Sequence, residues 1–220
     1  EPGPPVVIAQ AAVEVTGPGA EIAELRAWLR GWPLRPEAIL VQPVWDEQKQ
    51  KALDIAADHG YLLASFPRKR MAIDLERNEA RLDLQLDTGA RAVMGEVTFQ
   101  QDVIRPGILQ SVPRFAPGDP YDAWLMERFR VELWRAGYFR SIEVVEQRDL
   151  EASPPRVDLD VRLEPRPPNT WQGTVGVGSD TGIRGQLRWD RHLISERGDS
   201  FRMNTGWQDH NNQFFLQGGY

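Results

Sequence analysis

The sequence predicts an α+β chain in which two tandem βααββ units precede the first antiparallel strands of a transmembrane β-barrel. Three observations predict it: a pattern that recurs after 77 residues, proline-rich segments that bound the units, and two-residue alternation of apolar and polar side chains after Trp171. The predicted divisions are residues 1–10 for the tail of a preceding unit and a linker, 11–90 and 91–168 for the two units, and 169–220 for the barrel strands.

An internal repeat is visible after each long helical pattern. Gly60-Tyr61-Leu62 follows the first pattern and Gly137-Tyr138-Phe139 follows the second, and 137 − 60 gives an offset of 77. Leu86 and Leu163, which end alternating strands, are separated by the same 77 residues. A constant offset between matching features indicates a duplicated supersecondary unit.

Each unit reads strand, helix, helix, strand, strand. In the first unit we expect these elements around residues 13–15, 22–29, 46–60, 71–75 and 82–86, with a turn at 77–80. In the second unit the corresponding positions are 97–99, 108–112, 121–133, 142–144 and 157–163. The second helix of each unit runs into a glycine, Gly60 or Gly137, the residue that most readily ends a helix in a left-handed conformation.

Proline-rich segments mark the ends of the units. Glu164-Pro165-Arg166-Pro167-Pro168 closes the second unit, and Glu1-Pro2-Gly3-Pro4-Pro5 opens the chain. Proline fixes φ and removes a backbone donor, so such a segment ends a strand and stiffens a joint. If the two segments are equivalent, residues 1–5 are the tail of an earlier unit and the parent protein carries at least three; coincidence is the alternative.

The runs after Trp171 each have one apolar and one polar face, because successive strand residues point to opposite sides. In one run, Ile183, Leu187 and Trp189 point one way and the polar residues between them point the other. The runs approach the roughly 9 to 11 residues of a membrane-crossing strand, whereas strands of soluble sheets usually have about 5 to 6. Trp171, Trp189 and Trp207 share the apolar face, as interfacial aromatic residues in a barrel or as core residues in a soluble sheet.

The charge of the chain argues against nucleic acid as a partner. The chain carries 26 basic and 32 acidic residues, a net charge of −6, so it has no basic excess to neutralise phosphates. Arg68-Lys69-Arg70 is the only tight basic cluster in the sequence. We interpret it as the solvated start of a strand rather than as a binding patch.

The sequence offers no pattern for catalysis, a cofactor or a metal. Its histidines, His59, His192 and His210, do not stand at metal-ligand spacing. No Gly-x-Ser-x-Gly elbow is present, and no helix follows the glycines at 173–178 to hold a phosphate. The absence of cysteine leaves the redox compartment open. We therefore expect a non-enzymatic protein with no cofactor and no metal.

The repeats, with their Gly-Tyr step and direct passage into barrel strands, resemble POTRA domains of the outer-membrane protein assembly superfamily. The segments 176–182, 187–189 and 196–201 are similar to the first barrel hairpins of the TamA family, the outer-membrane subunits of the translocation and assembly module. Gly198-Asp199 departs from that family, which commonly has Gly-His there. The general assembly factor BamA and two-partner secretion transporters therefore remain alternatives.

The resemblance implies a location in the Gram-negative outer membrane, with the POTRA domains in the periplasm. It implies a role in the insertion or secretion of outer-membrane proteins of the autotransporter class. The implied partners are unfolded precursors, a TamB-like inner-membrane protein and the lipid bilayer around the barrel. The alternatives are a two-partner secretion transporter and a soluble periplasmic peptide-binding scaffold.

By the same resemblance, POTRA domains bind extended polypeptide by β-augmentation, in which the incoming segment pairs with an open sheet edge. We expect such edges at residues 71–76 and 141–148, with a merely solvated edge as the alternative. The candidate edge residues are Met71, Ile73, Leu75, Ile142 and Val144.

The first barrel strand is a second candidate site. Gly173, Gly176 and Gly178 lie close together, and glycine weakens a strand because it adds entropy cost and removes packing side chains. We expect residues 171–179 to form one side of a lateral seam that a substrate strand can enter, although glycines at a barrel corner or against packed neighbours would look the same. The candidate pairing residues are Trp171, Gly173, Val175 and Val177.

Overall fold

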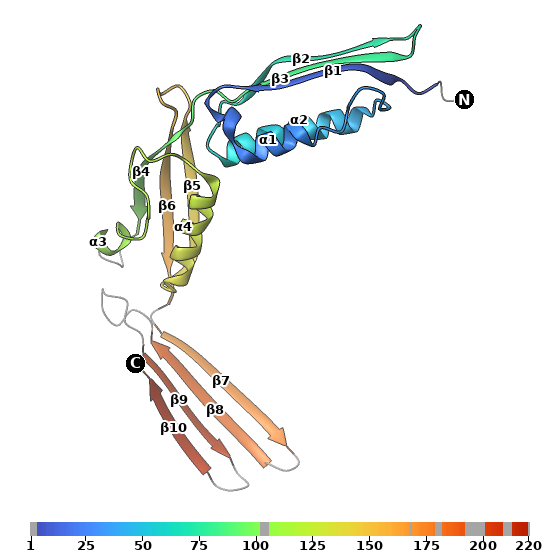
Figure 1. Ribbon diagram of the computed structural model, residues 1–220. Helices are drawn as coiled ribbons and strands as arrows, with labels where there is room; N and C mark the ends of the chain where they lie inside the picture. Colours follow the sequence, from blue (N-terminus) through green and yellow to red (C-terminus); the bar gives the residue numbers. More distant parts are fainter. Residues whose placement is uncertain are drawn as a thin grey trace. The chain divides into compact units, whose positions relative to one another are not determined.

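The described residues of the computed structural model form three separate sheets, with the strand orders β1-β3-β2, β4-β6-β5 and β10-β9-β8-β7 (Figure 1). The structure describes residues 4–101, 106–167, 169–178, 182–191, 201–208 and 213–219. The predicted α+β class, with strands dominant and few helices, is confirmed. Ser179, the last residue of the expected seam, lies outside the described residues, as does most of the segment 196–201.

The first repeat is a three-stranded sheet with two helices on one face (Figure 1). Its elements are β1 (Val7–Thr16), the 3-10 turn η1 (Pro18–Glu21), α1 (Ala23–Arg30), α2 (Gln42–Asp58), β2 (Ser65–Asp74) and β3 (Glu79–Asp87). The central strand β3 pairs with β1 in parallel and with β2 in antiparallel orientation. β1 and β2 are therefore the two edges of this sheet.

Two boundaries in the first repeat differ from the sequence prediction. β1 begins at Val7, inside the segment 1–10 that we assigned to a linker, because pairing with β3 extends a strand whose alanine-rich start has a weak pattern. Leu75, expected in a strand, lies in the turn that follows β2. Asp74 fixes this turn by accepting hydrogen bonds from the backbone N–H groups of Glu76 and Arg77.

The core of the first repeat is rich in tryptophan. Trp28 and Trp32 pack edge to face with ring centres 5.3 Å apart, and Trp32 and Trp45 do so at 6.0 Å. The Trp28 and Trp32 indole N–H groups donate to backbone carbonyl oxygens, which removes the cost of burying them. These rings close over buried residues on the inner face of the sheet, namely Ile8, Leu82, Leu84 and Leu86.

The second repeat has the same strand order, with the last strand in the centre. Its elements are β4 (Val93–Gln100), α3 (Pro106–Leu109), α4 (Ala123–Arg135), β5 (Phe139–Asp149) and β6 (Arg156–Pro165). Tyr121, Phe129 and Leu133 of the segment 121–133, which we expected to be helical, are buried. The first helix is shorter than predicted: α3 ends at Leu109, and Val112 lies beyond it.

The last sheet is an antiparallel meander of β7 (Asn169–Gly178), β8 (Gly182–Arg191), β9 (Phe201–Gln208) and β10 (Gln213–Gly219). Trp171 pairs with Trp189, and Trp189 with Met203, so these residues share one face. The predicted alternation therefore corresponds to a continuous register across all four strands.

The loop after α2 makes a tight junction with the start of the second repeat. Gly60 has a left-handed φ of 87°, and a β-carbon added there would lie 2.3 Å from the Tyr121 carbonyl oxygen. The Ala92 N–H donates to the Gly60 oxygen at 2.8 Å, and the Tyr121 N–H donates to the Ala92 oxygen at 2.9 Å. The Arg91 guanidinium also donates to the Tyr121 carbonyl at 3.2 Å. The Gly-Tyr step is thus part of a close backbone contact.

The Tyr121 side chain is held by charged residues of β5. Its hydroxyl donates to the Glu146 carboxylate at 3.1 Å, and Arg148 donates to the same carboxylate at 2.8 Å. Burial, followed by the negative charge of Glu146, raises the pKa of Tyr121 to about 12. The neutral phenol is therefore stabilised by the fold.

Replacing Gly60 with alanine should destabilise the junction. A left-handed conformation costs a residue with a β-carbon about 1–2 kcal/mol, and the clash with Tyr121 adds about 1–3 kcal/mol of overpacking. Urea unfolding followed by tryptophan fluorescence should show a lower midpoint for Gly60→Ala. Gly107→Ala is the control, because a β-carbon there meets nothing within 4 Å. Equal midpoints for the two variants would contradict the junction.

The raised pKa of Tyr121 should make stability fall at high pH. An unfolded tyrosine ionises near pH 10 and the folded residue near 12, so the folded state holds one more proton between these values. Its stabilising effect is complete below pH 10 and is lost as the pH rises to about 12. Phenolate absorbance at 295 nm should show a late step that Tyr121→Phe abolishes; identical titrations above pH 11 would refute this.

Candidate functional site

The edge strand β2 carries part of the predicted binding site of the first repeat. Met71 and Ile73 lie on it, opposite Leu82 and Ala80 of β3, and Ile73 is 46% exposed. Leu75 does not belong to this edge, because it lies in the following turn. The structure thus brings two of the three predicted residues onto one open strand.

In the second repeat, β5 is the corresponding edge strand. Ile142 and Val144 lie on it and are half-buried. Its charged side chains have partners: Arg140 pairs with Glu164 at 3.3 Å, Glu143 with Arg162 at 3.4 Å, and Arg148 with Glu146 at 2.8 Å. The backbone of this edge strand is therefore open to pairing, while these charged side chains already have ionic partners.

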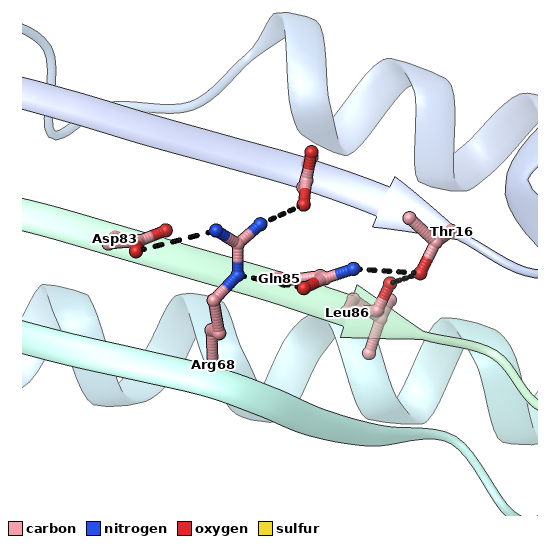
Figure 2. A network of polar contacts seen from close by, with 6 residues as sticks. Thr16, Arg68, Asp83, Gln85 and Leu86 are labelled. Carbon is pink, nitrogen blue, oxygen red and sulfur yellow. Dashed lines mark hydrogen bonds and ion pairs between the residues drawn. The ribbon is translucent and has the colours of Figure 1, made fainter.

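A polar network lies on the helix-free face of the first sheet (Figure 2). The Arg68 guanidinium donates to Gln85 at 2.8 Å and lies 3.7 Å from the Asp83 carboxylate. It also forms an ion pair with Glu14, so one arginine of β2 bridges all three strands. Thr16 extends the network by donating to the Leu86 carbonyl. These exposed ion pairs each contribute little to stability, but they fix the direction of Arg68.

The first barrel strand, β7, is an edge of its sheet in the described residues. Trp171, Val175 and Val177 are exposed, Val175 at 81%. A β-carbon at Gly173 would meet no atom within 4 Å, so packed neighbours do not explain this glycine. At Gly176, by contrast, an added β-carbon would lie 3.0 Å from the flexible Arg184 side chain. The structure therefore presents all four predicted seam residues on one open strand.

One face of the last sheet is apolar and, in the described residues, exposed. Trp171 and Trp189 stack with ring centres 5.4 Å apart, and Phe201 meets Trp189 edge to face. The Trp189 indole N–H donates to the Asn169 side chain at 3.1 Å. The large exposed residues of this face are Trp171, Val175, Val177, Ile183, Leu187, Trp207, Phe214 and Leu216. A water-soluble sheet would normally bury such a patch.

The opposite face is polar and holds an ionic cluster. Asp190 accepts hydrogen bonds from Arg188 at 2.7 Å and from Arg202 at 2.6 Å. Phe215 also points to this face and lies over Gly206, where a β-carbon would come within 2.4 Å of the ring. The sequence alone missed this pair, because Phe215 interrupts the alternation and its glycine partner is on another strand.

None of the helices in the described ranges has the length and apolar content needed to span a bilayer. Across those same ranges, acidic and histidine side chains form no group of three that could hold a metal ion.

Comparison with solved structures gives the fold. No family model matches the sequence. The chain is similar to BamA from Haemophilus ducreyi lacking POTRA domains 1–3, with a TM-score of 0.65 and 17% identity over 91% of this chain and 37% of that one. It is also similar to CdiB from Acinetobacter baumannii, with a TM-score of 0.52 and 13% identity over 99% and 41% of the two chains.

The chain spans about two fifths of the length of these structures. At such low identities the likeness shows the fold alone. That fold is a series of POTRA domains followed by strands that correspond to part of the BamA barrel.

Replacing Gly206 with alanine should destabilise the last sheet. The new methyl group would displace the Phe215 ring, at an overpacking cost of about 1–3 kcal/mol. The thermal midpoint of the complete protein in detergent micelles should fall. Gly185→Ala is the matched control, because a β-carbon at that position of the same sheet is unopposed. Equal losses in both variants would mean that the Phe215 contact is not what matters.

Proposed function

We propose that this chain belongs to an outer-membrane protein assembly or secretion factor, with its POTRA repeats in the periplasm and its last sheet in the outer membrane. The uncovered apolar face of β7 to β10 carries this proposal. Its side chains alternate with polar ones over strands of 7 to 10 residues, as expected where lipid replaces protein as the neighbour. The BamA-like fold supports the same reading.

The repeats act in this proposal as docking sites for extended polypeptide. The edges β2 and β5 offer unpaired backbone groups to outer-membrane precursors, which bind by adding a strand. Backbone pairing tolerates many sequences, which suits a factor that handles varied unfolded substrates. The role requires no bond-breaking chemistry.

The strand β7 acts as one side of a lateral seam. Gly173 and Gly176 weaken the specification of register, so a precursor strand can pair with β7 before it moves into the bilayer. Trp171, Val175 and Val177 line the lipid-facing side of this strand. Precursor pairing and release into lipid would then occur at the same edge.

A TamA-type subunit of the translocation and assembly module is our preferred assignment within this class. It rests on the resemblance of residues 176–182 and 187–189 to that family. The partners would be autotransporter precursors and a TamB-like inner-membrane protein. A two-partner secretion transporter is the second candidate, favoured by the match of 99% of this chain to CdiB, a protein of the Omp85/TpsB superfamily.

Disulfide trapping tests the seam directly, because this chain contains no cysteine. Single cysteines at positions 171, 173, 175 and 177 of the complete protein should capture a cysteine-bearing precursor stalled during assembly. Met203→Cys is the control, because β9 is already paired on both sides with β8 and β10. Capture at Met203→Cys equal to that along β7 would rule out a seam at this strand.

A further inference from the structure

Two strands of the first sheet, β2 and β3, place arginines on its helix-free face, and β2 adds a lysine at the edge. Arg68 and Arg70 of β2 and Arg81 of β3 point to this face, since their neighbours Leu82 and Leu84 point into the core. Lys69 lies between the two arginines of β2 and is exposed. The edge strand therefore carries positive charge in three consecutive residues.

Arg68 engages two of the acidic residues of this face, and Asp74, Glu79 and Asp87 lie on the same face toward the ends of β2 and β3. Arg68 pairs with Glu14 and with Asp83, and it also binds Gln85. Asp83 is the cross-strand neighbour of Arg70, yet the carboxylate is engaged by Arg68. In the part of the chain that the structure describes, Lys69, Arg70 and Arg81 have no hydrogen-bonded or ionic side-chain partner. Their charge is available to an incoming group.

A hollow of about 370 Å³ lies between these free arginines. In the register of the two strands Arg70 lies opposite Asp83, and Ala72 lies opposite Arg81. Arg70 and Arg81 are therefore diagonal neighbours across β2 and β3. Short side chains at Ala12 and Ala72 leave the space between them unfilled. The hollow is large enough for a side chain ending in a carboxylate, and it is lined by Gln10, Ala12, Arg70, Ala72, Arg81 and Asp83 among others.

A strand that adds to β2 would continue the pleat of the sheet. Its side chains on the helix-free face would lie beside Arg68 and Arg70 and reach toward the hollow, and those on the other face would lie near Lys69. We infer that the β2 edge selects extended segments that carry acidic side chains at alternate positions. This inference rests on the proposed function and names the class of polypeptide that this edge prefers.

The competing reading is that basic residues on β2 keep the edge from pairing with anything, since lysine on exposed edges commonly does so. That reading predicts weak binding of acidic and neutral strands alike. The second repeat provides an internal comparison, because the charges of β5 are already paired there. Selection by charge should therefore belong to β2 and not to β5.

The test uses the complete protein carrying Ile73→Cys in β2 and three peptides of about ten residues, each with one terminal cysteine. All three have valine at alternate positions, with Glu, Gln or Lys between. We expect the Glu peptide to bind and cross-link about fivefold to tenfold more strongly than the Gln peptide, because two or more opposite-charge pairs form across strands. The Lys peptide should bind least. The preference should vanish near 1 M salt, where the screening length is only about 3 Å.

The double variant Arg70→Gln, Arg81→Gln should lose most of the preference. Neither side chain has a hydrogen-bonded or ionic partner among the described residues, so the unfolding midpoint of the variant should match the parent. Arg140→Gln, Arg162→Gln is the control with the same change in charge, and it should keep the preference.

The outcomes separate the inference from the proposed function. Equal cross-linking of the Glu and Gln peptides overturns charge selection but leaves strand capture at β2 intact. No cross-linking of any peptide overturns both. An undiminished preference in the Arg70→Gln, Arg81→Gln variant overturns the assignment to these two arginines.

Discussion

Unpaired backbone at the edges of sheets is the constraint on which the rest of this molecule depends. Each backbone N–H or C=O group needs a hydrogen-bond partner. At an exposed edge a row of these groups is left unpaired by the sheet and can pair with another strand. The edges β2, β5 and β7 all leave such groups open. The candidate sites coincide with these edges, because the same feature that would endanger an ordinary sheet is what a strand-binding protein uses.

The last sheet adds a second constraint, which concerns its side chains. On its polar face Asp190 forms ion pairs with Arg188 and Arg202. On its apolar face the aromatic rings contact one another, and the large side chains are exposed in the described residues. Burial of apolar surface is the main favourable term in folding, so a sheet with one apolar face is stable only when another layer, its neighbour, covers that face. In the proposed function, a bilayer supplies that neighbour without any further protein element.

The two repeats share a fold and differ in their edges. The Gly-Tyr step recurs at the same offset, and the last strand of each repeat lies in the centre of its sheet. On β5 Arg140 and Arg148 have ionic partners, whereas Lys69 and Arg70 on β2 have none among the residues that the structure describes. The two repeats thus share their packing and differ in the charges of their exposed edges, since exposed edge residues can change at little cost to the core.

The sequence by itself determined the repeat, the strand-rich class and the two faces of the last sheet. These features are local: the direction of the β-carbon alternates along a strand, so Leu82, Leu84 and Leu86 reveal a buried face without any knowledge of neighbours. The C-terminal glycine of a helix is equally local, which is why Gly60 could be assigned its role from sequence.

Only the tertiary structure decided features that depend on which strands meet. Pairing with β3 set the start of β1 at Val7, and an aspartate-capped turn took Leu75 out of β2. Phe215 found its place over Gly206 of the neighbouring strand. Arg68, and not Arg70, took the carboxylate of Asp83. Except for the local turn at Leu75, each of these outcomes joins residues from separate strands, and the pattern along one strand does not show which strand will lie beside it.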